Sequence, residues 1–305
     1  MGAMPDFDHI RFFRETLETQ LRRLRKGRFK LHLPRPLGGG IRRVAGTHFH
    51  FNPELFIQVG GQTSFSFPRE KIRLLADEAL LVPRGLPHHE IARNFDGNFL
   101  NLVVMFPREG VSIHAAVGGN KGNPIPCDLE YFKTDKGRHI EQYLDDIVDF
   151  YHSSGNGKKE PEIEKAIQGL FQATLASLLM IVKQVKTLDR TTEHPKVSAC
   201  RKYILSHIYE SSLSVKNLAE QLRSSPDYLS HLFVTEAGER ITDFIHQERI
   251  ALAKRHLQNP ALNIKEIAWA CGFADQGYFT RLFKRLSGET PKAFRKKFGI
   301  TIFTG

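Results

Sequence analysis

Residues 263–288 read NIKEIAWACGFADQGYFTRLFKRLSG, and the same order of cap, helix, turn and helix occurs in residues 214–238, which read SVKNLAEQLRSSPDYLSHLFVTEAG. Each copy starts with a residue that can cap a helix, contains an aliphatic residue followed by alanine, and ends in the spacing Phe-x4-Gly. The alanine allows two helices to cross closely, and a short turn with Gly272 in the second copy suits the ~90–120° crossing of a helix–turn–helix motif. The sequence therefore predicts two helix–turn–helix units.

A single predicted helix, residues 241–258, joins the two units. Its inward apolar residues are Ile241, Phe244, Ile245, Leu252 and Leu257. At ~1.5 Å per residue this helix is about 25 Å long, which suits two recognition helices held near the ~34 Å spacing of successive major grooves. Residues 195–305 carry 17 Lys and Arg against 10 Asp and Glu, whereas the first 194 residues carry 27 against 23. This basic excess attracts polyanions, so double-stranded DNA is the expected partner.

The second helix of each motif has a predictable outer face. Once its apolar residues are buried, these residues are predicted to face DNA bases: Asp227, Ser230, His231, Gln276, Gly277, Thr280 and Arg281. Arg281 can bond guanine, and Gln276 adenine, through two hydrogen bonds each. Other cations are better placed for phosphates: Arg223, Lys284, Arg285, Lys292, Lys296 and Lys297. Because the first copy is poor in base-reading side chains, either the second copy carries more of the specificity or the first reads DNA shape. Trp269 and Tyr278 are expected to be core aromatics.

The first 186 residues have a different texture. Apolar residues at three- and four-residue steps predict a helix over residues 8–25. Residues 28–126 are short apolar runs broken by Gly and Pro, which is typical of an all-β sandwich or barrel. Helical periodicity returns over residues 139–150 and 162–186. The wide apolar stripe of the last helix predicts a dimer surface, with helix 8–25 as the second candidate, and internal packing is the alternative for both.

Four residues of the strand-rich region, His48, His50, Glu54 and His88, resemble the ligand set of cupin motifs, which implies a potential metal site. Alternation along a strand puts His48 and His50 on one face, and three imidazoles with one carboxylate suit Fe, Mn, Ni or Zn. The alternative is that these side chains are polar groups of an effector pocket. The apolar lining of that pocket would come from Phe49, Phe51, Phe56, Phe65 and Phe67.

The second helix–turn–helix copy also carries a family signature. The residues Ile267-Ala268-x3-Gly272-Phe273-x4-Tyr278-Phe279-x3-Phe283-Lys284-x3-Gly288-x-Thr290-Pro291-x3-Arg295 resemble the signature of the AraC/XylS transcription regulators. The resemblance covers about 100 residues of the C-terminal part. It implies sequence-specific promoter binding, usually activation through RNA polymerase, governed by a small effector. We expect a sugar or an aromatic acid as the effector and a homodimer as the working form.

The histidine set resembles the two motifs of cupin barrels, in which such ligands converge on a divalent metal. In the second motif Asp77 stands in place of the first glycine and Ala92 in place of the final asparagine. AraC/XylS regulators often keep the histidine and glutamate outline without metal. We therefore expect no cofactor, with a divalent metal in the barrel as the alternative.

The expected fold is a multidomain α and β protein, with a cupin-like β-barrel flanked by helices and an all-α double helix–turn–helix domain. The expected divisions are an N-terminal helix in residues 1–27, a cupin-like sensing and dimerisation domain in 28–186, a linker in 187–195 and an AraC-type DNA-binding domain in 196–305.

Composition excludes several classes of protein. With 305 residues, 41% hydrophobic and 25% charged, the chain is typical of ordinary globular proteins. Its cysteines, Cys127, Cys200 and Cys271, form no CxxC pair, which excludes a disulfide framework or a zinc ribbon. No export signal and no apolar run of ~18 residues is evident, so we expect a cytoplasmic protein without a membrane span.

The leading hypothesis is a transcription factor and not an enzyme. Two alternatives use His48, His50, Glu54 and His88. One is a metal-dependent cupin enzyme with an accessory DNA-binding tail, and the other is a metal-sensing regulator.

Overall fold

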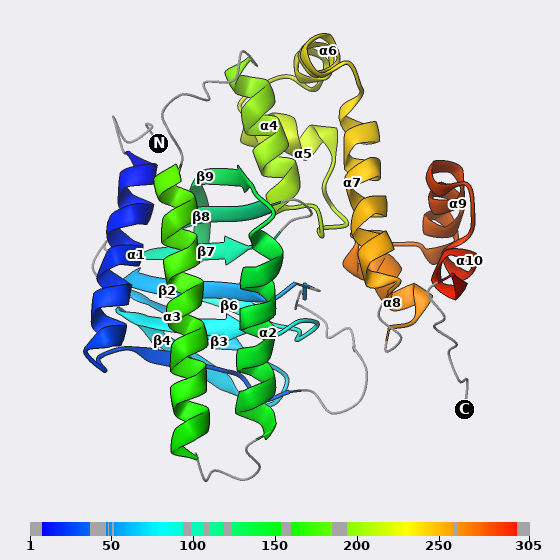
Figure 1. The fold of residues 1–305 in the computed structure, drawn as a ribbon. Helices are drawn as coiled ribbons and strands as arrows, with labels where there is room; N and C mark the ends of the chain where they lie inside the picture. The colour runs from blue at the N-terminus through cyan, green and yellow to red at the C-terminus, as the bar shows by residue number, and fades with distance from the viewer. Residues whose placement is uncertain are drawn as a thin grey trace. The chain divides into compact units, whose positions relative to one another are not determined.

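The structure is a computed structural model, and its described residues fall into two compact units (Figure 1). It describes residues 8–36, 47, 49–50, 52–93, 99–106, 110–118, 124–153, 160–184, 194–258 and 262–297. The N-terminal unit holds three helices and nine strands among these residues, and the C-terminal unit holds seven helices.

The strands of the N-terminal unit form two sheets. The elements are α1 (His9–Arg25), β1 (Lys30–His32), β2 (Glu54–Gly60), β3 (Gln62–Ser66), β4 (Lys71–Leu75), β5 (Glu78–Val82), β6 (His89–Arg93), β7 (Leu100–Met105), β8 (Gly110–Gly118), β9 (Pro124–Lys133), α2 (Gly137–Ser153) and α3 (Pro161–Gln184). One sheet has the strand order β1-β5-β2-β7-β8-β9 and the other β4-β3-β6. Among the described strands β1 and β5 run parallel, and the other pairs are antiparallel.

The six-stranded sheet contributes to a core on each of its faces, because side chains alternate along a strand. Leu55 and Ile57 of β2 lie in a core with the apolar residues of α1, α2 and α3. Phe56, between them, lies in a second core with Phe65 of β3 and Leu74 of β4. Figure 1 shows α1, α3 and α2 side by side over the helical face of the sheet.

The prediction of a strand-rich N-terminal region flanked by helices is confirmed, but its closure into a barrel is not. Among the described residues no strand pairing joins the two sheets or closes either of them. The strand region also extends beyond the predicted limit at residue 126, since β9 continues to Lys133.

By length and composition alone, α3 is long and apolar enough to cross a membrane, a property that a search for uninterrupted apolar runs does not detect. In this fold α3 is a core helix. Phe171, Leu175 and Leu178 are buried in the core shared with α1 and α2. Lys183 near its end pairs with Glu18 of α1 at 2.7 Å.

The C-terminal unit is entirely helical where it is described. Its helices are α4 (Pro195–Ser206), α5 (Val215–Gln221), α6 (Pro226–Ala237), α7 (Ile241–His256), α8 (Ile264–Ala270), α9 (Gln276–Ser287) and α10 (Pro291–Lys296). Proline is accepted at the first helical position because that N–H has no partner inside the helix. This explains why Pro195, which we had expected in the linker, begins α4 with His194 as its cap.

The predicted helix ends of both helix–turn–helix units are confirmed. Ser214 accepts a hydrogen bond from the backbone of Asn217 to cap α5, and Asn263 forms a reciprocal capping box with Glu266 at the start of α8. Gly238 and Gly288 end α6 and α9 in the left-handed conformation that glycine adopts readily.

Candidate nucleic-acid interface

The two turns between helices have the same geometry. Ser224 N–H donates to the Ala219 carbonyl in the first unit, and Phe273 N–H donates to the Ala268 carbonyl in the second, both at 2.9 Å. The residue before each donor has a positive φ, 47° at Arg223 and 80° at Gly272. The two predicted motifs are thus a structural repeat.

Glycine is required in the second turn. A Cβ on Gly272 would lie 2.7 Å from the Ile208 carbonyl oxygen and 2.8 Å from the guanidinium of Arg249. Both contacts are too short for carbon. The first turn tolerates Arg223 in the same backbone region, which L-residues with a side chain enter at a cost of about 1–2 kcal/mol.

Arg249 ties α7 to its surroundings. It is 7% exposed, and its guanidinium donates to the carbonyls of Ile208 at 3.0 Å and Glu210 at 2.6 Å. The guanidinium also lies over the ring of Phe273, 5.6 Å from its centroid. Burial lowers the pKa of Arg249 to about 10. The helix of 16 residues, about 24 Å long, is therefore fixed to the end of α4 and to the second turn. We did not single out Arg249 from the sequence, although its place four residues after Ile245 puts it on the buried face.

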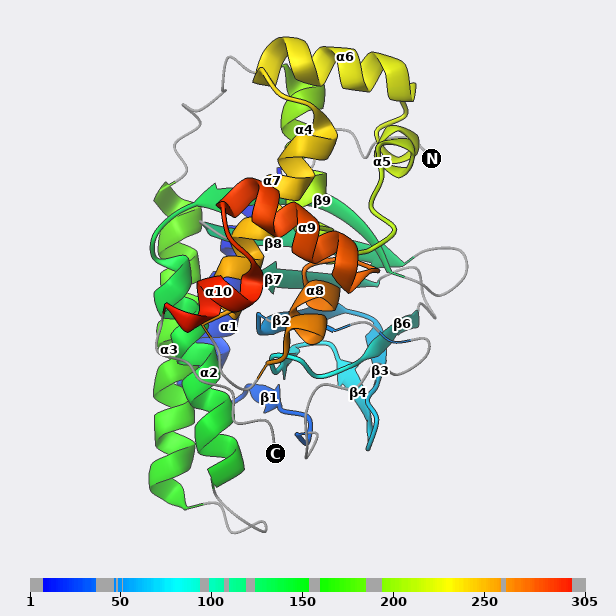
Figure 2. The ribbon, with the colours of Figure 1, turned by 90° about the vertical axis from the view of Figure 1, so that its right-hand side faces the viewer.

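The helices α6 and α9 run in the same direction and present their N-terminal ends on the same side of the unit (Figure 2). Each is held by buried aromatic residues, Phe233 in α6 and Phe279 and Phe283 in α9. The predicted base-facing residues Asp227, His231, Gln276, Gly277 and Arg281 are exposed, and Ser230 and Thr280 are half-buried. The leading ends of both helices are thus accessible.

Two predicted base-facing hydroxyls are already engaged. Ser230 donates to the Pro226 carbonyl at 2.7 Å, and Thr280 donates to the Gln276 carbonyl at 2.9 Å. Their oxygens keep the capacity to accept hydrogen bonds. Sequence pattern alone did not reveal this loss of donors.

All six cations predicted to meet phosphates are exposed: Arg223, Lys284, Arg285, Lys292, Lys296 and Lys297. Among them, Lys297 pairs with Glu289 at 2.6 Å. Five of the six lie in or after α9, so the second unit carries most of this charge.

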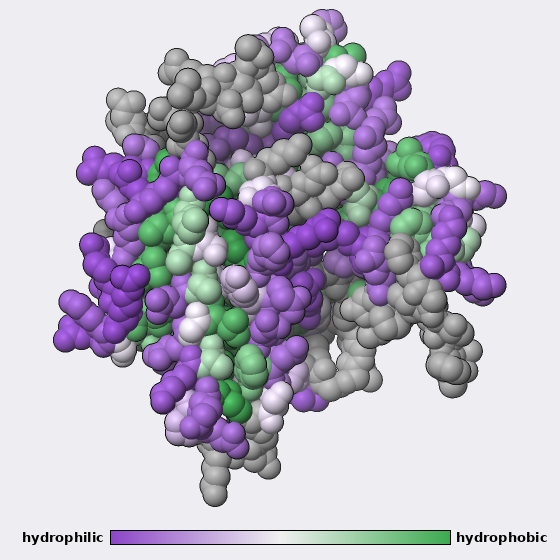
Figure 3. All heavy atoms as spheres, viewed as in Figure 1, coloured by the Kyte–Doolittle hydropathy of each residue, from purple (hydrophilic) through white to green (hydrophobic). Residues whose placement is uncertain are grey.

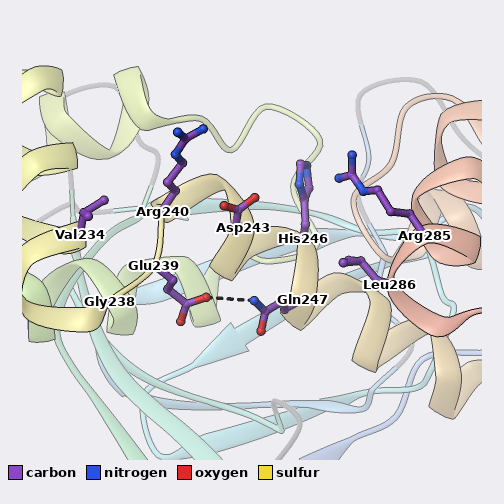
Figure 4. Close-up of a pocket in the computed structure, with 9 residues that line it drawn as sticks. All are labelled: Val234, Gly238, Glu239, Arg240, Asp243, His246, Gln247, Arg285 and Leu286. Atoms are coloured by element: carbon purple, nitrogen blue, oxygen red, sulfur yellow. Dashed lines mark hydrogen bonds between the residues drawn. The ribbon is translucent and has the colours of Figure 1, made fainter.

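A cleft of about 640 Å³ lies between the C-terminal ends of α6 and α9, with α7 between them. The side chains of Arg240, Asp243, His246 and Arg285 extend to one side of the cleft (Figure 4). Glu239 and Gln247, on the other side of α7, are joined by a hydrogen bond of 3.0 Å (Figure 4). The sequence analysis had not identified Arg240 or His246.

Tyr278 joins α9 to α7 through a 3.1 Å hydrogen bond between its hydroxyl and Nε2 of His246. The residue is 42% exposed although its ring contacts Phe273 and His246, so the expectation of a core aromatic is wrong for Tyr278. Burial first, and then the charges of Arg249 and Arg285, lower the pKa of His246.

In the N-terminal unit, His50, Glu54 and His88 come together, with one ligand atom from each within 4.8 Å of the others. The carboxylate of Glu54 is 3.4 Å from Nε2 of His88 and 3.6 Å from Nε2 of His50. Nδ1 of His88 donates a hydrogen bond to the Leu86 carbonyl at 3.1 Å. This bond leaves Nε2 of His88 facing the Glu54 carboxylate. These donors suit a divalent metal. His48, the fourth predicted member, lies outside the described residues.

Glu90 belongs to the same neighbourhood, although the sequence motif did not include it. Burial, followed by the charge of Glu54, raises the pKa of Glu90 to about 7. Glu90 of β6 pairs directly with Phe65 of β3, so the two side chains lie on the same face of the small sheet. Alternation from His88 along this strand could have identified it.

The predicted aromatic lining is only partly described, and what is described forms a core. Phe56 and Phe65 meet with ring centroids 4.8 Å apart, and Phe67 stacks on Phe65. All three are at most 8% exposed, since the two sheets close over them. Phe51 lies outside the described residues, and Phe49 is half-buried. Asp77, at the place of a motif glycine, has φ 69°, which explains why glycine would suit that position.

Comparisons with known proteins agree on the C-terminal part. Residues 218–297 match the model of a helix–turn–helix domain family. The chain is 31% identical over 144 residues to the uncharacterized HTH-type transcriptional regulator YijO of Escherichia coli, which covers 46% of this chain and 50% of that protein. It is 28% identical over 134 residues to the arabinose operon regulatory protein of Escherichia coli, covering 42% of this chain and 46% of that one.

Among solved structures, the C-terminal domain of AraT, a response regulator from Geobacillus stearothermophilus, is 32% identical, and the match covers 38% of this chain and 95% of that domain with a TM-score of 0.35. The chain spans about half the length of the curated relatives it matches. These relatives are regulators of transcription and not enzymes.

Proposed function

We propose that this chain, whose residues 218–297 match a helix–turn–helix domain family, is a regulator of the AraC/XylS type that binds promoter DNA. The observation that carries this proposal is the pair of recognition helices, α6 and α9. Their N-terminal ends are exposed on one side, and Arg249 fixes the helix between them. A regulator of this kind acts in the cytoplasm, where the DNA is.

In this proposal the second helix–turn–helix unit makes most of the contacts to DNA bases and to DNA phosphates. Arg281 takes guanine and Gln276 takes adenine, while Lys284, Arg285 and the cations of α10 contact phosphates. In the first unit, Asp227 and His231 are the predicted base-facing residues that are exposed. We assign base contacts there to His231, because the Asp227 carboxylate repels phosphate.

The cleft between α6 and α9 faces the stretch of DNA between the two half-sites. Arg240 and Arg285 extend to the same side of this cleft (Figure 4). We assign both to phosphates, which position the protein without specifying sequence.

We further propose that a small effector, a sugar or an aromatic acid, binds between the two sheets beside His50, Glu54 and His88. The face of the large sheet that meets the small sheet also carries buried polar side chains, on β7 and β8. Asn101 and Ser112 are 1% exposed, and Asn101 Oδ1 and Ser112 Oγ have no hydrogen-bond partner among the described residues. Buried polar atoms of this kind favour a hydroxyl- or carboxylate-bearing ligand.

The same unit supplies the proposed dimer surface. Hydrophobic residues gather along α3 in Figure 3, and Met180 is 52% exposed. A helix with this much uncovered apolar surface is stabilised by a second copy. In the dimer the effector shifts which half-sites can be reached together, and activation then proceeds through RNA polymerase.

A metal-sensing regulator is the second candidate function, favoured by the convergence of His50, Glu54 and His88. Titration of purified full chain with Zn²⁺ or Mn²⁺ tests it. Stoichiometric binding that a His50→Ala change abolishes, and that alters DNA affinity, supports metal sensing. Binding without any effect on DNA affinity contradicts it.

The main proposal is tested by selecting sequences from a random DNA library with the full chain. We expect one enriched site with two half-sites about one helical turn apart. Binding should weaken steeply as salt rises, because each phosphate contact releases counterions. Failure to enrich any sequence, or equal binding to competitor DNA, would contradict the proposal.

A further inference from the structure

A second cleft lies in the N-terminal unit, at the ends of α1, α2 and α3 that are lowest in Figure 1. Its volume is about 1150 Å³. It is bounded by the end of α1, by β1 and the segment after it, by the last residues of α2 and by the first turns of α3. It lies on the helical face of the large sheet, whereas Glu54 and His88 lie between the two sheets. The two sites are therefore distinct.

The walls of this cleft are apolar and incompletely covered. Phe29 stacks on Phe171 with ring centroids 5.0 Å apart. Leu31, Ile163 and Ile167, which also line the cleft, are only half-buried. Half-exposed apolar side chains around a concavity gain free energy when an apolar body fills it.

The rim of the cleft is cationic. Arg35, Arg69 and Lys165 line it and are exposed, and Glu164 is the single acid among the described lining residues. One guanidinium nitrogen of Arg69 donates to the Pro36 carbonyl at 3.2 Å, which orients the side chain. An anionic group at the rim can form charge-assisted hydrogen bonds with cations of this kind.

A polar atom is also available at the wall. Nε2 of His152 is buried and has no hydrogen-bond partner among the described residues. Burial lowers the pKa of His152, which favours the neutral imidazole. A carboxylate or a hydroxyl could satisfy it.

We propose that this cleft binds an amphipathic anion, a molecule with an aromatic or aliphatic body and one carboxylate or sulfonate group. The apolar body lies against Phe29, Ile163 and Ile167, and the anionic group lies at Arg69 and Lys165. Because the site is built from α1, β1, α2 and α3 together, the bound ligand joins these elements and stabilises the unit. The site is separate from the effector site proposed between the sheets.

The test uses the full chain and the fluorescent probe 8-anilinonaphthalene-1-sulfonate, which combines an aromatic body with one sulfonate. We expect saturable binding with one probe per chain. Decanoate should displace the probe at a concentration at least about tenfold lower than decanol, because the neutral alcohol lacks the charge-assisted contacts.

Matched variants locate the site. Replacing Arg69 and Lys165 together by Gln should weaken probe binding about tenfold, and Ile167→Ser should weaken it through the apolar wall. Arg14→Gln, which removes an exposed cation of α1 that does not line the cleft, should leave the affinity within twofold. Circular dichroism melting of each variant confirms that the fold is retained.

Three results would overturn the proposal. They are equal affinity in the double variant and in Arg14→Gln, equal displacement by decanol and decanoate, and dissociation of a dimer as the probe binds, which would make the cleft an interface between copies. Since no readout involves DNA, failure here leaves the DNA-binding proposal standing, and failure of DNA binding leaves this one standing.

Discussion

The two helix–turn–helix units are alike where the fold requires it and different where they face outward. Leu232, Phe233 and Gly238 of the first unit correspond to Leu282, Phe283 and Gly288 of the second, each 50 residues later.

On the outer faces the match ends. His231 and Val234 of α6 stand where α9 has Arg281 and Lys284. Val234 leaves an apolar side chain 44% exposed at a place where the second unit has a cation. The comparison teaches that the buried positions of a recognition helix preserve its placement while the outer positions are free to set its affinity.

The largest expected effect separates the two turns. Gly272→Ala should destabilise the C-terminal unit by about 3 kcal/mol, because the new Cβ meets Ile208 and Arg249 at a positive φ. Arg223→Gly, in the matching turn, should change stability by less than about 1 kcal/mol, since relief of strain offsets the added chain entropy. Urea unfolding followed by the fluorescence of Trp269, the single tryptophan, measures both. Equal losses of stability in the two variants would contradict the prediction that only the second turn requires glycine.

The next largest expected effect is a difference in DNA-binding free energy between changes on the exposed faces of α9 and α6. Arg281→Ala should cost about 2 kcal/mol of DNA-binding free energy and relax preference at one base pair. His231→Ala, the matching change in α6, should cost less than about 1 kcal/mol. Fluorescence anisotropy against a set of single base-pair variants of the selected site measures both. A larger loss from His231→Ala would mean that the first unit dominates specificity.

A gain of charge sharpens the same comparison. Val234→Lys gives α6 the cation that α9 has at Lys284, so the slope of log affinity against log salt should steepen by about one. Lys284→Gln should make it shallower by a similar amount. The control is Val234→Gln, which adds a polar side chain without charge. An unchanged slope in Val234→Lys would place this part of α6 away from the phosphates.

The smallest expected effect is a pH dependence of stability that arises at the contact between α7 and α9 of the second unit. His246 lies against α9, and burial together with Arg249 and Arg285 lowers its pKa. A histidine with a lowered folded pKa gives stability that is present above its unfolded pKa of about 6.5 and is lost as pH falls below that value.

The C-terminal unit should therefore unfold at lower urea concentration at pH 5 than at pH 7. His246→Gln should reduce this difference, and the exposed His231→Gln serves as the control. If both variants keep the full pH dependence, the titrating group is elsewhere.

The C-terminal unit could be predicted closely from the sequence because its determinants are local. Helix caps at Ser214 and Asn263 and terminal glycines act within a few residues of their position in the chain. The sequence pattern did not predict contacts in this unit between residues far apart in the chain. An example is the hydrogen bond from Arg249 to the carbonyl of Ile208, 41 residues away.

The N-terminal unit was less predictable for the same reason. Alternation identified strands, but not that β1 pairs in parallel with β5 or that the sheets stay separate in the described residues. The resemblance to cupin motifs implied that His48, His50, Glu54 and His88 converge, and the three described members do lie together. Phe56 and Phe65 were expected to line a pocket, and they form a core because both sheets supply a partner ring, a fact visible only in three dimensions.

That α6 and α9 run the same way gives the domain polarity on DNA. If the two helices ran in opposite directions, a single chain would fit a palindromic site and could bind that site in either orientation. Under the proposed function, a single chain with both helices pointing alike would match a tandem, asymmetric site. Reversing that site on a promoter would turn the bound chain end for end. Affinity would then be unchanged while the transcriptional output differs.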